Sequence, residues 1–392
     1  MRRAALILIL IATVGGGAYW YSQSDAPPAP INKEAGREEE EQVGETAAVT
    51  TIVRNLEIPW DIAFLPEGGM LVTERTGHVI AIALDGTQKE LPVPGVKKTG
   101  EGGLLGIVLH PDFKSNHLLY LYMSAPGTSD QTQNRVVRYR YENGILTEDR
   151  VIIDHIPGAT YHDGGRMEFG PDGMLYITTG DATTPKIAQD KNSLGGKILR
   201  LKDDGVVPTD NPFGTDSTGS TTLTTGSSPQ AAVWSYGHRN PQGLAWDSAG
   251  RLWETEHGPT GEGGRCCNDE INFIQKGANY GWPTIIGGEY KAGMITPAWG
   301  SEEDTWAPAS IAYLDGKLYF GGLKGEALYE AVLDGERIVE FKEHFKGEFG
   351  RIRTVRVGPD GMLYLTTSNR DNRGSPTADD DRILRINPEK LR

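Results

Sequence analysis

The chain has 392 residues, of which 51 are glycine and two are cysteine, and its formal net charge at pH 7 is −14. An acidic chain is poorly suited to nucleic acids, which bind clustered Lys and Arg. Two cysteines exclude a disulfide framework or a cysteine-rich zinc site. The 38% of hydrophobic residues is low for a polytopic membrane protein. Glycine is at about twice its usual share of roughly 7%, which favours an all-β fold with many tight turns.

Residues 1–21 form a predicted targeting segment. Arg2 and Arg3 precede an apolar run at 4–14, and small residues follow at 15–18. This order is typical of a cleaved signal peptide. An N-terminal membrane anchor, with the aromatic residues 19–21 at the interface, is equally compatible with it. Both alternatives place the body of the protein outside the cytoplasm, either secreted or periplasmic, or tethered to the outer face of the cytoplasmic membrane.

Residues 22–48 have the composition of a disordered linker. Prolines are concentrated at 27–30, and four consecutive glutamates occupy 38–41. Such a segment buries too little apolar surface to fold by itself. The folded domain is therefore expected at 49–392.

That domain repeats one pattern, a turn rich in Pro, Asp and Gly followed by an alternating strand. The six copies begin at Pro66, Pro111, Pro171, Ser248, Leu314 and Pro359. Asp-Gly turns between alternating runs indicate hairpins, because Gly supplies the positive φ that the turn needs. Repeats spaced by roughly 45 to 77 residues are typical of propeller blades. The sequence therefore predicts a six-bladed β-propeller of four-stranded antiparallel blades.

In such a fold the loops carry the function, and one loop places His162 before a repeat strand and Asp181 after the same hairpin. The two ends of a hairpin lie close together, so Asp181 can orient His162. A histidine held by a carboxylate is the arrangement of a general base near neutral pH. A purely structural His–Asp pair is the alternative.

Two further groups of polar side chains stand out in the sequence. Arg239 and Asn240 occupy a loop suited to bind something planar or anionic. Arg351 and Arg353 share one face of a predicted strand, and Lys324 lies in a Gly-rich turn. Three converging cations in an acidic chain suggest a multiply anionic small ligand. Ordinary surface ion pairing is the alternative.

The segment from Gly258-Pro259 to Asp269-Glu270 offers backbone carbonyls and carboxylates, the ligands that calcium prefers, although the carboxylates could equally pair with cations or cap turns. Between them lie Cys266 and Cys267, which predict either a vicinal disulfide or two free thiols. Their adjacency argues against a thioredoxin-like role, which needs two intervening residues. A structural clamp of the loop is favoured.

Six motifs, in order along the chain, resemble those of the soluble dehydrogenases of glucose and other aldose sugars that depend on pyrroloquinoline quinone (PQQ). They are GEGGLLGIVLHPDF, HDGGRMEFGPDG, SYGHRNPQGLAWD, EHGP, NDEINFIQKGANYGWP and GRIRTVRVGPDGMLY. The resemblance runs from about Leu56 to the last repeat. It implies a six-bladed propeller, in agreement with the repeat count. It also implies PQQ, a planar tricarboxylate, as cofactor.

The resemblance also implies residue roles. The catalytic set is His162 as general base, Asp181 as its orienting carboxylate, and Arg239 near the reactive carbonyl. The PQQ contacts are Glu101, His162, Arg239, Asn240, Lys324, Arg351 and Arg353. The backbone carbonyls of Gly258 and Pro259 correspond to ligands of an active-site Ca²⁺ that also coordinates PQQ.

The implied reaction is oxidation of an aldose at its anomeric carbon. His162 removes the hydroxyl proton, and the C1 hydride passes to the C5 carbonyl carbon of PQQ. Ca²⁺ and Arg239 stabilise charge on the quinone oxygen. The product is a lactone, and an external acceptor (a quinone, a cytochrome or a dye) reoxidises the cofactor. We expect the protein to be a monomer or a homodimer and to have no nucleic-acid partner.

The chain departs from the glucose-specific branch at several positions. Glu101 and His257 each stand where that branch has Gln, and an insertion occupies 260–267. These changes favour a broad aldose dehydrogenase over a dedicated glucose enzyme. Glu289 and Glu303 are tentative ligands for an additional structural Ca²⁺.

Two other functions remain open from the sequence. One is a non-catalytic extracellular propeller that binds a partner, which would be expected to lose some of the site residues. The other is a calcium-dependent lactonase or other hydrolase, which would need carboxylate or Asn ligands in the central channel but no cation cluster. Propellers host many functions, so the fold alone cannot decide between them.

Overall fold

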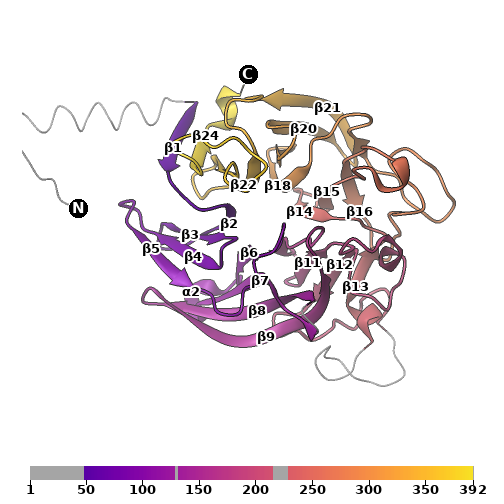
Figure 1. Ribbon diagram of the computed structural model, residues 1–392, viewed down its shortest axis with the longest axis horizontal. Coiled ribbons are helices and arrows are strands. Elements are labelled where there is room, and N and C mark those ends of the chain that lie inside the picture. Colours follow the sequence, from indigo (N-terminus) through magenta and orange to yellow (C-terminus); the bar gives the residue numbers. More distant parts are fainter. Residues whose placement is uncertain (1–47, 129–130, 215–227, 392) are drawn as a thin grey trace, which may run out of the picture. The chain divides into compact units, whose positions relative to one another are not determined.

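The computed structural model describes residues 48–128, 131–214 and 228–391. Within these residues the chain forms six four-stranded sheets, and all pairings are antiparallel. The sheets are arranged around a common centre (Figure 1). The predicted six-bladed β-propeller is confirmed. The predicted leader at 1–21, and the predicted linker at 22–48 except for its last residue, lie outside the described residues.

The blades follow one another along the chain. Blade 1 contains β2 (Pro59–Phe64), β3 (Met70–Glu74), β4 (His78–Ile82) and β5 (Gln88–Pro92). Blade 2 contains β6 (Leu104–Leu109), β7 (Leu118–Pro126), β8 (Thr132–Glu142) and β9 (Ile145–Gly158). Blade 3 contains β10 (Met167–Phe169), β11 (Leu175–Thr179), β12 (Lys197–Leu201) and β13 (Val233–Tyr236).

The second half of the ring repeats this order. Blade 4 contains β14 (Pro241–Trp246), β15 (Leu252–Glu256), β16 (Glu270–Ile274) and β17 (Trp299–Gly300). Blade 5 contains β18 (Pro308–Leu314), β19 (Lys317–Gly322), β20 (Leu328–Asp334) and β21 (Arg337–His344). Blade 6 contains β22 (Ile352–Val357), β23 (Leu363–Thr367), β24 (Ile383–Ile386) and, as its outer strand, β1 (Val49–Val53).

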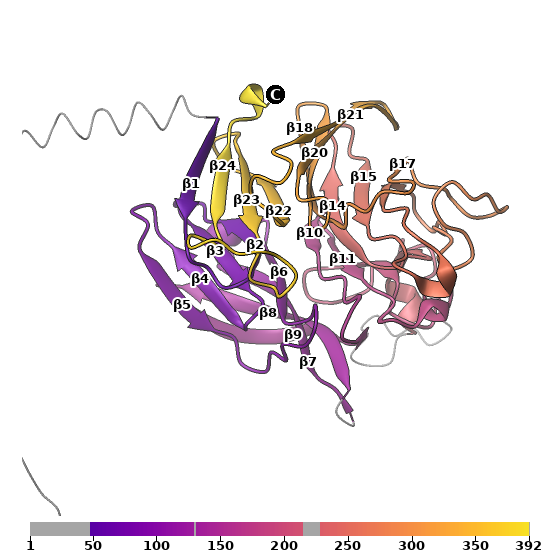
Figure 2. The ribbon, with the colours of Figure 1, turned by 45° about the horizontal axis from the view of Figure 1, so that its top comes forward.

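The ring is closed by the first strand of the domain. β1 pairs antiparallel with β24, with Val49 opposite Ile386, and Figure 2 shows the two strands side by side. The first strands of neighbouring blades contact each other all the way round, including β22 against β2. Closure leaves no open end of the array, which is how a propeller avoids exposed sheet edges.

The repeated turn forms a hairpin, as the sequence predicts, and it joins the first and second strands of each blade. In the GPDG copies of blades 3 and 6, Gly173 and Gly361 both have a φ of +74°. The carboxylates of Asp172 and Asp360 accept the backbone N–H two residues ahead, at 3.0 and 3.2 Å. Identical local chemistry therefore gives identical turns, and each turn fixes the start of the second strand.

The strands are buried on both faces because each blade packs on its neighbours. All five residues of β3 and all five of β11 are buried. Trp60 of blade 1 is 1% exposed and packs with Leu105 and Met167 of the next two blades. This sandwiching explains why even the polar residues of these strands, such as Thr73 and Thr178, are buried.

Helices are few and short in the described residues. They are α2 (Phe113–Asn116) and the 3₁₀ segments η2 (Pro185–Ala188), η4 (Pro229–Ala232), η5 (Glu262–Gly264) and η6 (Pro388–Lys390). Across the described ranges 48–128, 131–214 and 228–391, no helix has the length and apolar character needed to cross a membrane.

Candidate active site

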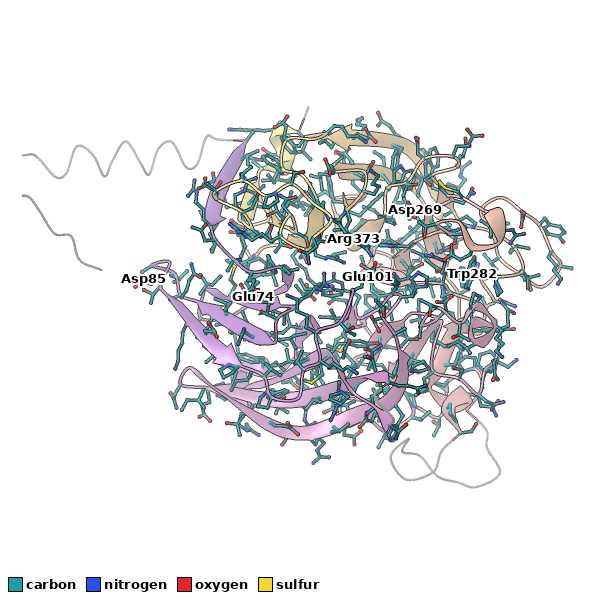
Figure 3. The ribbon with its side chains drawn as sticks, viewed as in Figure 1. Glu74, Asp85, Glu101, Asp269, Trp282 and Arg373 are labelled. Carbon is teal, nitrogen blue, oxygen red and sulfur yellow. A yellow bond between two sulfur atoms is a disulfide. The ribbon has the colours of Figure 1, made fainter. Side chains whose placement is uncertain are left out.

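The candidate site lies at one end of the ring. A cavity of about 820 Å³ is lined by residues that precede the first strand or follow the second strand of several blades. Because the first two strands of each blade are antiparallel, these positions fall at the same end of every blade. Figure 3 places Glu101 and Arg373, both cavity residues, near the centre of the ring.

Most of the site residues expected from the sequence line this cavity. They are Glu101, His162, Asp181, Arg239, Lys324, Arg351 and Arg353. Asn240 is fully buried and lies outside the lining, where its Oδ1 accepts the backbone N–H of Gly164 at 3.1 Å. Gly258 and Pro259 line a second, much smaller cavity beside Arg239 and His257.

His162 and Asp181 form the expected pair. His162 Nδ1 lies 2.7 Å from Asp181 Oδ1, and the Asp181 side chain has no exposure to solvent. Asp181 also accepts hydrogen bonds from Trp282 Nε1 at 2.8 Å and from the Thr183 backbone N–H at 2.9 Å. A carboxylate facing Nδ1 places the ring proton there, so the Nε2 atom of His162 keeps its lone pair for a substrate proton.

Tight backbone packing holds this pair. His162 has a φ of +64°, and Gly164 and Gly165 also have positive φ. The Ala182 backbone N–H donates to the carbonyl of His162 at 3.1 Å. A Cβ on Gly180 would lie 1.9 Å from that same carbonyl oxygen, so only glycine allows the two ends of the hairpin to approach.

Glu101 is an ionised carboxylate at the cavity wall. It accepts Arg373 Nη1 at 2.7 Å and the His162 backbone N–H at 3.3 Å. Burial opposes its ionisation, yet the charges of His257 and Arg373 together with the hydrogen bond from His162 lower its pKa to about 2. Burial in turn lowers the pKa of His257 to about 3. His257 is therefore neutral near pH 7, and we attribute the ionised state of Glu101 to Arg373 and the backbone N–H.

The wall of the cavity carries an excess of positive charge. Its cations are Arg75, Arg239, Lys324, Arg351, Arg353 and Arg373, and its carboxylates are Glu101, Asp181, Glu262 and Asp371. Counting Arg, Lys, Asp and Glu alone, six cations against four carboxylates give a net charge of +2, in a chain whose overall charge is −14. The cavity therefore attracts anions although the protein as a whole repels them.

The cations differ in how fully they are already paired. Arg351 donates twice to Asp371 Oδ2, at 3.1 and 2.8 Å, and once to the carbonyl of Leu323. Arg353 donates from Nη1 to Gln242 Oε1 at 2.8 Å, and burial, reinforced by Arg75, lowers its pKa to about 9.

Several buried polar atoms at this site lack a partner among the described residues. They are Nε of Arg75, Nε of Arg353, Nε2 of His257 and Nδ2 of Asn240. Unsatisfied buried donors at a cavity wall are costly unless a ligand pairs with them. The residues present therefore fit a multiply anionic ligand.

The guanidinium of Arg239 is held by several hydrogen bonds and lies over an aromatic ring. Its Nε and Nη2 donate to Glu262 Oε1, the former at 3.2 Å, and Nη1 donates to the carbonyl of His257 at 3.3 Å. The guanidinium carbon lies 5.5 Å from the centroid of the Trp282 ring. Arg239 is 3% exposed, so its head group is held in place at the cavity.

An acidic cluster lies beside the smaller cavity. His238, Glu254 and Glu256 place one ligand atom each within 4.8 Å of one another, and Glu270 lies opposite Glu256 on the neighbouring strand. Burial, together with the negative charge of Glu256, raises the pKa of Glu270 to about 8. The smaller cavity, of about 10 Å³, is lined by Glu256 and Glu270 together with Gly258 and Pro259. Two carboxylates at so small a cavity are ligands that a hard cation such as Ca²⁺ prefers.

The loop after β15 is fixed independently of any metal. Gly258 donates its N–H to Asp269 Oδ1 at 2.9 Å, and a Cβ there would meet the Cys267 carbonyl oxygen at 1.9 Å. Cys266 and Cys267 form the vicinal disulfide that the sequence left open. Glu289 pairs with Arg265 at 3.4 Å, and Glu303 is exposed.

Sequence reasoning missed several members of the site: Arg75, Glu262, Asp371, Arg373 and Trp282. A signal for three of them was present in the repeat. Arg75 directly follows the second strand of blade 1, and Asp371 and Arg373 follow that of blade 6, as Asp181 does in blade 3. Glu262 was hidden in the segment 260–267, which the sequence marks only as an insertion relative to the glucose-specific branch.

A buried His–Asp pair opening onto a cation-rich cavity of a propeller is the arrangement expected of an enzyme that acts with an anionic ligand. Comparison with known proteins makes this specific. The profile of the glucose/sorbosone dehydrogenase family matches residues 56–377. Aldose sugar dehydrogenase YliI of Escherichia coli is 34% identical over 358 residues, covering 82% of this chain and 90% of that protein.

Solved structures agree. The PQQ-bound aldose sugar dehydrogenase of Streptomyces coelicolor has a TM-score of 0.76 and 39% identity, covering 86% of this chain and 97% of that one. A glucose dehydrogenase-like oxidoreductase of Thermus thermophilus has a TM-score of 0.79 and 42% identity, covering 86% and 99%. The chain belongs to the glucose/sorbosone dehydrogenase family, and it is an oxidoreductase of the PQQ-dependent sugar dehydrogenase type.

Proposed function

We propose that this protein is a PQQ- and calcium-dependent aldose dehydrogenase that converts the anomeric hydroxyl of an aldose to the lactone, with His162 as general base. The observation that carries the proposal is the His162–Asp181 pair at 2.7 Å, placed at the wall of a cavity with six cationic side chains. The resemblance noted in the sequence and the family membership point to the same chemistry.

His162 accepts the proton that the substrate hydroxyl loses. Its Nδ1 is occupied by Asp181, so Nε2 accepts the proton of the anomeric hydroxyl. Asp181 then stabilises the imidazolium that forms, as a carboxylate does in other base pairs of this kind. Trp282 and the Thr183 backbone keep that carboxylate oriented.

The cationic wall holds the cofactor. Lys324, Arg351 and Arg353 would bind the carboxylates of the cofactor, and Arg239 would face its reactive end, while Glu101 and Asn240 would complete the contacts. When bound, PQQ supplies a two-electron acceptor for the C1 hydride. The unpartnered Nε atoms of Arg75 and Arg353 support this role, because an anionic ligand would satisfy them.

Calcium is assigned to the carbonyls of Gly258 and Pro259, with the carboxylates of Glu256 and Glu270 at the same small cavity. A divalent cation there would offset the buried negative charge of the cluster and sit next to Arg239. Bound there, it would supply Lewis-acid stabilisation of negative charge that develops during the reaction.

The substrate and the setting are proposed on the same basis. The substrate is a reducing sugar, taken broadly rather than as glucose alone, and an external acceptor returns the cofactor to its oxidised form. The protein acts outside the cytoplasm, either released or tethered by its N-terminal segment.

The test is reconstitution of the protein with PQQ and Ca²⁺, followed by dye reduction with a panel of aldoses and identification of the lactone. The proposal expects activity that needs PQQ, that EDTA treatment of the apoprotein abolishes, and that His162→Ala lowers by roughly 10²–10⁴-fold. Absence of PQQ binding would refute it. Lactone hydrolysis without PQQ would instead favour the hydrolase alternative.

A further inference from the structure

Glu262 pairs with Arg239, the residue that is expected to face the reactive carbonyl of the cofactor. Its Oε1 accepts both Nε and Nη2 of Arg239, and its Oε2 accepts the Thr260 backbone N–H at 2.6 Å. Thr260 Oγ1 accepts Arg239 Nη2 as well, at 3.2 Å. Both Thr260 and Glu262 line the main cavity, so a carboxylate stands at the wall where an anionic ligand would bind.

The carboxylate is ionised. Burial opposes this, but the hydrogen bond and the charge of Arg239 hold the pKa of Glu262 below its usual value. The Arg239–Glu262 pair is therefore close to neutral overall. Without Glu262, Arg239 would present a full positive charge to the cavity.

The segment that carries Glu262 is fixed from several sides. The Gly261 N–H donates to the Arg265 carbonyl at 2.8 Å, and Thr260 pairs with Cys266 in an isolated bridge. Arg265 Nη1 donates to the Pro283 carbonyl at 3.2 Å, and Cys266 is linked to Cys267. These contacts place Glu262 in a closed loop whose position does not depend on Arg239 alone.

Arg239 has few other strong partners. Apart from Glu262, its guanidinium donates only to the His257 carbonyl and to Thr260 Oγ1, at 3.3 and 3.2 Å, among the described residues. Glu262 thus does two things at once. It fixes the plane of the guanidinium, and it offsets its charge.

We propose that Glu262 is a positioning residue for Arg239 that also weakens the hold of the site on PQQ and lowers the reduction potential of the bound cofactor. The proposal rests on the proposed function, because it takes Arg239 to be a ligand of PQQ. Its physical basis is that a negative charge beside an anionic ligand disfavours binding. It disfavours the reduced form further, since reduction adds negative charge to the quinone oxygen next to Arg239.

Three variants separate the two roles. Glu262→Gln keeps an oxygen that can accept from Arg239 but removes the charge, and Glu262→Ala removes both. Asp85→Asn removes one negative charge from the outer edge of blade 1, far from the cavity, and is the control for net charge (Figure 3). Each apoprotein is checked by its melting temperature before use.

The first measurement is the dissociation constant of PQQ by calorimetry, in the presence of Ca²⁺. Glu262→Gln is expected to bind PQQ roughly tenfold or more tightly than the wild type, with Asp85→Asn unchanged within about twofold. The second measurement is the reduction potential of bound PQQ, which is expected to be more positive in Glu262→Gln. Equal or weaker PQQ affinity in Glu262→Gln, or an unchanged potential, would overturn the electrostatic role.

The positioning role is tested by turnover. Glu262→Ala is expected to have a lower kcat than Glu262→Gln, because only the amide can still hold the guanidinium in place. Equal kcat values in the two variants would overturn this part. If the wild-type protein itself does not bind PQQ, the proposed function fails. If the wild type binds it and the variants behave alike, only the role of Glu262 fails.

Discussion

The sharpest consequence of the site geometry concerns Asp181. Three donors converge on its buried carboxylate: His162 Nδ1, Trp282 Nε1 and the Thr183 backbone N–H. Asp181→Asn keeps the shape but offers one oxygen in place of two, and its amide group must face at least one donor. His162 loses the negative charge that stabilises its protonated form in either orientation of the amide, and in one orientation it also loses its hydrogen bond.

The size of the effect follows from what the pair contributes. General-base catalysis by an oriented group is worth about 10²–10⁴-fold, and each tenfold corresponds to about 1.4 kcal/mol of barrier. We expect kcat to fall by about 10³-fold, or about 4 kcal/mol. One buried donor left unpaired costs about 1–3 kcal/mol of stability in addition. PQQ affinity should not fall, because the variant removes a carboxylate and no cation from the cavity wall.

The assay is steady-state dye reduction at saturating PQQ and Ca²⁺, with PQQ binding measured separately. Trp282→Phe serves as a matched control, since it removes one donor to Asp181 and leaves the carboxylate in place. It should cost much less, about tenfold or below. A kcat for Asp181→Asn within about threefold of the wild type, at undiminished PQQ affinity, would refute the reasoning.

Three further predictions concern buried charges outside the His–Asp pair. Burial, helped by nearby carboxylates, raises the pKa of Glu74 to about 7. The folded state therefore holds a proton that the unfolded state loses above about pH 4.5, and stability is lost as pH rises towards 7. Glu74→Gln should increase the free energy of unfolding by about 2 kcal/mol at pH 8, seen as a higher melting temperature, and leave it unchanged at pH 4. An equal gain in stability at both pH values would contradict this. Arg353→Met should weaken PQQ binding at least about tenfold while stabilising the apoprotein, since it removes a buried, under-paired cation; calorimetry and melting curves check both. Asp61 is buried, and its Oδ2 lies 2.5 Å from Arg166 Nη1 and 2.9 Å from Arg356 Nη2. Asp61→Asn should therefore lower the free energy of unfolding, measured by chemical denaturation, by about 3–5 kcal/mol. A loss below about 1 kcal/mol would contradict this expectation.

Local chemistry explains which parts of the fold the sequence predicts. The Asp-Gly turns of the repeat set their own geometry, as the equal φ values of Gly173 and Gly361 show. The His162–Asp181 pair was predictable because the two residues flank one hairpin. Arg351 and Arg353 were predictable because two residues apart on a strand means the same face. In each case the interacting residues are close in the chain or share one repeat.

Contacts made across the ring could not be predicted in this way. Arg373 pairs with Glu101, which is 272 positions away in the chain, and Trp282 reaches Asp181 from 101 positions away. These neighbours exist only once the blades close around the centre. The pairing of Arg239 with Glu262 depends on a loop that the repeat does not contain. The sequence therefore indicated where the chemistry lies, while ring closure determined which charges meet there.

The most direct test of the account is a single-turnover experiment on the protein loaded with PQQ and Ca²⁺. An aldose is mixed with the loaded protein in the absence of any acceptor, and the absorbance of the cofactor is followed. The account predicts reduction of one PQQ per protein by the wild type. It predicts equal PQQ binding but reduction slowed by roughly 10²–10⁴-fold in His162→Ala. Reduction of the cofactor at the same rate in both proteins would contradict the assignment of His162 as the base at this site.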